Sequence, residues 1–120
     1  MNYKLTFLLY LLLSVVCNSY AQLDHIHYLP PLKQTSNEGG FIEQEIYFST
    51  PETTPFSVNI YRGSNPTPIR VITNLSNNNP KSYNPGDADN NITLVTNANT
   101  GIVLSNSGLH FESSNGAIFY

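Results

Sequence analysis

Two histidines near the start of the chain have a spacing that could bind a metal ion. His25 and His27 lie two residues apart, so on an extended strand both side chains point to one side and can share zinc or copper. A third ligand would have to be the adjacent Asp24 or His110, the only other histidine. No zinc motif surrounds the pair. A polar segment that packs on the domain is the plainer interpretation, and we predict no metal site.

Three side-chain oxygens alternate along a polar segment further on. Asp87, Asp89 and Asn91 are spaced two residues apart, a pattern that suits a hard cation such as calcium. The segment departs from the EF-hand pattern, because Ile92 stands where that pattern has glycine and Ala98 where it has glutamate. We therefore predict a solvated turn without a cofactor, and calcium binding by the 87–91 loop stays the alternative.

The sequence carries no catalytic motif. Glu43 and Glu45 would share one face of a strand, but a general acid and base need a cleft and two different environments. Exposed glutamates on an outward face are far more common. The chain has neither a G-x-S-x-G elbow, nor Ser-x-x-Lys, nor a phosphate-binding glycine loop. We predict that the chain is not an enzyme.

Four tyrosines offer a different chemistry. Tyr28, Tyr47, Tyr61 and Tyr83 alternate with other residues in segments that read as extended chain. Their flat rings could form a platform for a sugar or a protein, since tyrosine combines a large apolar surface with a polar tip. The alternative is ordinary packing with the hydroxyl groups in water.

The elements that position these side chains are predicted to be strands. From Phe41 to Ser49, residues Ile42, Ile46 and Phe48 alternate with polar ones, and this period of two indicates a half-buried strand. Residues 74–91 read as a long polar loop. No helical period is present after the first 21 residues, so the pattern predicts an all-β, antiparallel β-sandwich-like domain over residues 41–120. The six further strands are expected at 56–61, 69–73, 92–96, 101–105, 109–112 and 117–120.

The first 21 residues have the features of a cleavable signal peptide. Lys4 precedes an apolar run over residues 5–16, which is too short to span a bilayer comfortably. Small residues at Ser19 and Ala21 predict signal-peptidase cleavage between Ala21 and Gln22. Val16 precedes Cys17, which disfavours a lipoprotein signal. Residues 22–40 are then expected to be an extended lead-in, because Pro-Pro and Gly-Gly pairs interrupt them.

Composition narrows the partners of the exported part. Cleavage would leave 99 of the 120 residues, without cysteine and with four basic against eight acidic side chains. A net charge of −4 disfavours nucleic acid and anionic membranes. We expect a secreted or cell-surface protein that contacts the membrane only transiently, through its signal peptide, and that binds an unknown protein or glycan.

The C-terminal residues Ile118-Phe119-Tyr120 are apolar and have no polar tail. Chain ends usually lie in exposed segments. We therefore expect this domain to be truncated and to continue into downstream domains of the same protein.

Parts of the chain resemble a known family. The quoted segments are HYLPPL (27–32), IYFSTPETTPFSVNIYRG (46–63) and the residues from Asn90 to Tyr120. They resemble the N-terminal region of large secreted proteins of gliding bacteria, related to the bacterial IgG-Fc-binding-protein-like family and commonly ending in a type B sorting domain for type IX secretion. The resemblance implies the N-terminal β module of an adhesin-like surface protein. An accessory domain of an extracellular hydrolase and a small stand-alone secreted β protein are the alternatives.

Overall fold

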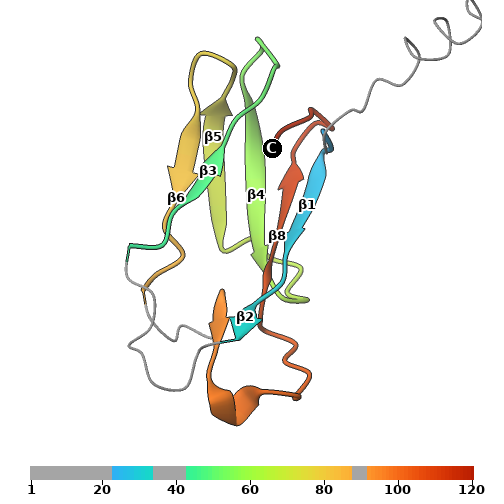
Figure 1. Ribbon diagram of the computed structural model, residues 1–120. Helices are drawn as coiled ribbons and strands as arrows, with labels where there is room; N and C mark the ends of the chain where they lie inside the picture. Colours follow the sequence, from blue (N-terminus) through green and yellow to red (C-terminus); the bar gives the residue numbers. More distant parts are fainter. Residues whose placement is uncertain (1–22, 34–42, 88–91) are drawn as a thin grey trace, which may run out of the picture.

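The computed structural model describes residues 23–33, 43–87 and 92–120 (Figure 1). The predicted signal peptide, its cleavage bond between Ala21 and Gln22, and residues 34–40 of the lead-in lie outside the described residues. The described part is all-β, as predicted, with several small and mainly antiparallel sheets and one short 3-10 helix, η1 (Asn97–Asn99). None of its helices is long and apolar enough to cross a membrane.

The main sheet has four strands in the order β1-β8-β4-β5, all antiparallel (Figure 1). They are β1 (Ile26–Leu29), β8 (Leu109–Ser113), β4 (Phe56–Arg62) and β5 (Arg70–Leu75). Alternation decides which side of each strand is buried: Phe56, Val58 and Ile60 on β4 turn inward, while the residues between them are partly exposed.

Two smaller sheets complete the fold. Strands β3 (Ile46–Phe48) and β6 (Lys81–Tyr83) pair antiparallel, whereas β2 (Leu32–Lys33) and β7 (Leu94–Val95) pair parallel. The β3–β6 pair covers the buried face of the main sheet, because the Phe48 ring on β3 packs edge-on against Phe111 of β8, with ring centroids 5.4 Å apart.

The core lies between these layers and includes the end of the chain. Phe119 is only 1% exposed and forms a single antiparallel bridge with Asp24. Next to it, Ser49 and Tyr120 exchange two backbone hydrogen bonds of 2.8 and 2.9 Å. The last residues therefore link β3 to the start of β1. The buried apolar cluster is Phe48, Phe56, Val58, Ile60, Ile72, Leu75, Leu109, Phe111 and Phe119.

Several predicted elements differ from the structure. Residues 22–40 were expected to lack regular structure, but β1 and β2 lie within them, because β8 offers β1 a complementary edge. The long loop over 74–91 contains β6, which pairs with β3. Residues 101–105 form no strand, since no neighbouring strand is available to bond their backbone. Residues 117–120 contribute single bridges only.

Candidate functional site

Three rings from three neighbouring strands lie side by side on the outer face of the main sheet. Cross-strand pairing places Tyr28 of β1 opposite His110 of β8, and His110 opposite Tyr61 of β4. His110 and Tyr61 are stacked, with ring centroids 4.4 Å apart and an interplanar angle of 8°. Tyr28 lies 5.6 Å from His110 at a tilt of 33°. We call Tyr28, His110 and Tyr61 the aromatic row.

The aromatic row faces away from the core because its members alternate with buried residues. On β8, Leu109 and Phe111 turn inward, so His110 between them turns outward. Tyr28, on the edge strand, is 75% exposed. Among the interactions of the described residues, none is a hydrogen bond to the Tyr28 hydroxyl, the Tyr61 hydroxyl or a ring nitrogen of His110. These polar groups are thus available to a ligand.

A cleft of about 500 Å³ adjoins the aromatic row. Tyr28 and His110 form one part of its wall, and the segment before β8 forms another. Figure 1 shows that segment running from η1 to the end of the main sheet where β1 leads into β2. The lining residues combine apolar surface with small polar groups: Tyr28, Leu29, Pro30, Pro31, Gly63, Ser64, Leu104, Ser105, Ser107, Gly108, Leu109 and His110.

Backbone contacts at the end of β4 fix the walls of this cleft. Gly63 N donates to Gly108 O at 2.9 Å, and Ser64 N donates to Ser105 O at 2.9 Å. Arg62 Nε donates to Asn106 O at 2.6 Å. The approach at Gly63 is so close that a Cβ built there would lie 2.0 Å from Ser105 O. The segment before β8 is therefore docked on the end of β4.

The other two tyrosines of the predicted platform lie elsewhere. Tyr47 is on β3 and is 76% exposed, and Tyr83 is partly buried on β6 opposite Ile46. Burial raises the pKa of the Tyr83 phenol, and the positive charge of Arg70 partly opposes this. The structure thus groups Tyr28 and Tyr61 and adds His110, which the sequence considered only as a metal ligand. Its position between inward-facing Leu109 and Phe111 was the signal for an outward ring.

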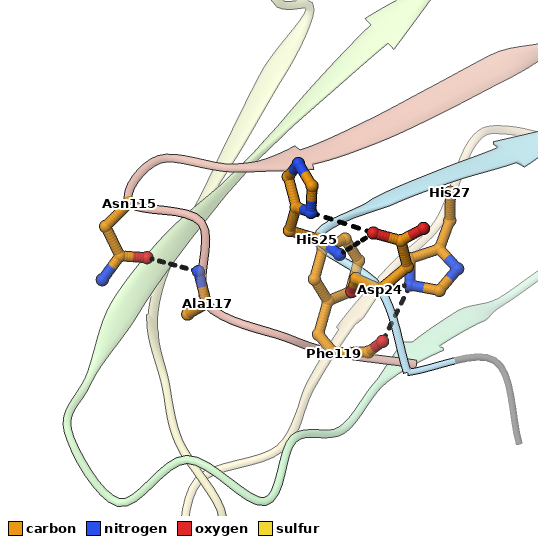
Figure 2. A network of polar contacts seen from close by, with 6 residues as sticks. All are labelled: Asp24, His25, His27, Asn115, Ala117 and Phe119. Carbon is orange, nitrogen blue, oxygen red and sulfur yellow. Dashed lines mark hydrogen bonds and ion pairs between the residues drawn. The ribbon is translucent and has the colours of Figure 1, made fainter. Parts of the chain in front are cut away.

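His25 and His27 take part in a network that joins the two ends of the domain (Figure 2). His27 Nε2 lies 2.7 Å from Phe119 O and 3.1 Å from Asp24 O. Both carbonyl oxygens are acceptors, so Nε2 must carry a proton and donate. His25 Nδ1 pairs with Asp24 Oδ1 at 2.9 Å. The backbone N–H of His25 also donates to Asp24 Oδ1, at 2.7 Å, and lowers the pKa of that carboxyl.

This arrangement separates the three histidines. His27 is paired with Phe111, whose side chain is in the core, whereas His110 is on the outer face. Neighbours on one strand point to opposite faces, so His110 does not approach His27. In the part of the chain that the structure describes, no three His, Cys, Asp or Glu side chains are grouped so that they could hold a metal ion.

The predicted carboxylate sites are only partly described. Glu43 has a positive φ of 58° and precedes β3, so it does not share a strand face with Glu45, and both side chains are exposed. Glu43 N donates to Asp87 Oδ1 at 2.9 Å. Asp89 and Asn91, the other members of the calcium candidate, lie outside the described residues.

A smaller pocket of about 300 Å³ lies between Leu29, Ile46 and Leu94. Its amide group is Gln44, whose Oε1 accepts from the Thr93 hydroxyl and whose Nε2 is buried without a partner. Tyrosine and histidine rings are absent from its described lining. The cleft beside the aromatic row is better suited to a ligand that needs both stacking and hydrogen bonds.

Comparisons of the chain with protein-family models, with curated proteins and with solved structures found no match. The resemblance to secreted proteins of gliding bacteria therefore stays a prediction, and the function has to be inferred from the chain itself.

Proposed function

We propose that this chain is an exported, non-catalytic binding module, the N-terminal part of an adhesin-like surface protein. The observation that carries the proposal is the aromatic row, a set of three rings held in register on adjacent strands and turned toward solvent. Aromatic side chains that bury much area with little conformational freedom to lose are typical of binding surfaces.

Further support comes from the sequence. The signal-peptide pattern places the module outside the cytoplasm, and an outward aromatic surface is costly to keep in water unless it serves contact with another molecule. The lack of catalytic motifs in the sequence favours binding over catalysis.

Cell fractionation tests this proposal. An antibody raised against residues 22–120 is expected to detect the protein at the cell surface or in the medium, in a species much larger than 13.4 kDa. A cytoplasmic protein would contradict export. A surface or secreted species slightly smaller than 13.4 kDa would contradict the multidomain part and favour a stand-alone secreted protein.

A further inference from the structure

We propose that the cleft beside the aromatic row binds an uncharged carbohydrate, with a sugar ring against Tyr28 and its hydroxyl groups on the polar groups of the cleft. The inference rests on the proposed function and names the class of its ligand. It depends on four properties of the cleft: its rings, its polar groups, its lack of charge and its rigidity.

The rings supply the stacking surface. One face of a pyranose carries mainly C–H groups, and this apolar face packs flat on an aromatic ring. Tyr28 is 75% exposed and lines the cleft together with His110. His110 is held between Tyr28 and Tyr61, so the stacking surface extends over three strands and lies on rigid elements.

The polar groups match hydroxyl-rich ligands. The Ser64 and Ser105 side chains are exposed at the cleft, and Ser64 Oγ donates a long hydrogen bond of 3.3 Å to Ser105 O. The His110 ring has both a donor and an acceptor when neutral. A few convergent polar groups in a largely apolar cleft are the usual composition of a small-ligand site.

Charge decides between neutral and ionic ligands. The residues that line the cleft include no Asp, Glu, Lys or Arg, although the exported part has eight acidic and four basic side chains. An anionic sugar or a charged peptide would lose hydration on entering without gaining an ion pair. A neutral sugar incurs no such cost.

The size and rigidity of the cleft fit the same ligand. Its volume of about 500 Å³ lies within the ~300–1,000 Å³ range of small-molecule sites, whereas a standard protein interface needs about 800 Å² on each partner. The contacts of Gly63 and Ser64 with the segment before β8 hold the walls in place before binding, which lowers the entropic cost of association.

Titration calorimetry with the mature chain, residues 22–120, tests the inference. The probes are hexasaccharides of neutral β-glucan, α-glucan, mannan and chitin, with polygalacturonate and a sulfated glycan as charged probes. We expect at least one neutral probe to bind, with an affinity that is unchanged between low and high salt because no ion pair forms. Tyr28→Ala is expected to raise its Kd about tenfold, the equivalent of ~1.4 kcal/mol.

Matched variants keep the result interpretable. Tyr47→Ala removes an equally exposed tyrosine that lies on β3, away from the row, and is expected to leave Kd unchanged. Tyr28→Phe keeps the ring and is expected to retain most of the binding. Both Tyr28 variants should unfold at nearly the wild-type denaturant concentration, because this side chain is mostly exposed.

The outcomes separate this inference from the proposed function. Failure of every neutral probe to bind, or neutral binding that Tyr28→Ala does not weaken, overturns the carbohydrate inference. If a charged glycan or a surface protein binds instead, and Tyr28→Ala abolishes that binding, the inference fails while the proposed binding module stands. If fractionation finds the protein in the cytoplasm, the proposed function fails as well.

Discussion

At the scale of single residues, Gly63 shows how one backbone position shapes the candidate site. Its φ is +54°, in the left-handed region where a side chain costs ~1–2 kcal/mol. In addition, a Cβ at this position would lie 2.0 Å from Ser105 O and 2.8 Å from Asn106 Cα. Both contacts are with backbone, which cannot move aside as a flexible side chain can.

We expect Gly63→Ala to lower the free energy of unfolding by about 2–4 kcal/mol, from the combined cost of the backbone conformation and the displaced segment. Gly116→Ala is the matched control, because Gly116 also has a positive φ, of 75°, but nothing lies within 4 Å of its added Cβ. That control should cost only ~1–2 kcal/mol. Urea denaturation of both variants measures the difference, and equal losses would mean that the docked segment yields without cost.

His27 and His110 are of one residue type, and their positions give them different roles. His27 is turned toward Phe119, with ring centroids 4.6 Å apart, and donates to the backbone there. His110 is turned outward and stacks on Tyr61. The first histidine fastens the N-terminal strand to the C-terminal residues, and the second belongs to the candidate binding surface.

At the scale of elements, β1 decides whether the aromatic row exists. This strand supplies Tyr28 and pairs with β8 over four residues. Ser113 N extends the pairing by donating to His25 O at 2.9 Å. Without β1, the outer edge of β8 would expose its unpaired backbone groups, which invite association with other chains.

A chain that begins at Pro30 tests this role. Compared with residues 22–120, we expect residues 30–120 to unfold at a lower urea concentration and to associate as protein concentration rises, because β8 becomes an edge strand. Light scattering and denaturation measure the two effects. As a second measurement on the intact chain, hydrogen exchange should show protected amides at His27 and Leu29. Equal stability of the two chains, with fast exchange at both amides, would show that residues 22–29 are only a lead-in.

At the scale of the whole molecule, the two layers are held together where the chain begins and ends. Phe119 packs near Phe48 of β3, with ring centroids 6.2 Å apart, and against His27 of β1. Its backbone pairs with Asp24, while Tyr120 pairs with Ser49. The final residues therefore connect the main sheet to the covering β3–β6 pair.

We expect Phe119→Ala to reduce the free energy of unfolding by about 3–5 kcal/mol, because a fully buried ring is replaced by a cavity. Tyr120→Ala provides the neighbouring control. Its side chain is 61% exposed, so removing it should change stability by less than about 1 kcal/mol. Chemical denaturation of both variants tests the expectation. A small effect of Phe119→Ala would show that the C-terminal residues do not join the layers in solution.

The all-β class and several strands could be predicted from the sequence because they depend on local alternation. Residues 46–48, 56–62 and 109–113 alternate apolar and polar side chains, and each is a strand with the expected face buried. The strand predicted at 69–73 is observed at 70–75, where Asn74 adopts a positive φ of 59° next to a shift in the pairing register. Local pattern thus determined the element types and their inner faces.

Strand pairing and the grouping of the aromatic row were decided by the tertiary structure. Ile102 and Val103 lie in an apolar segment that local pattern favours as a strand, yet Val103 is 97% exposed because no edge is available to it. Residues 26–29 are interrupted by prolines immediately afterwards, yet they form a strand because β8 offers one. Tyr28, Tyr61 and His110 come together for the same reason: backbone hydrogen bonds need a partner strand, and which partner is available depends on the whole chain.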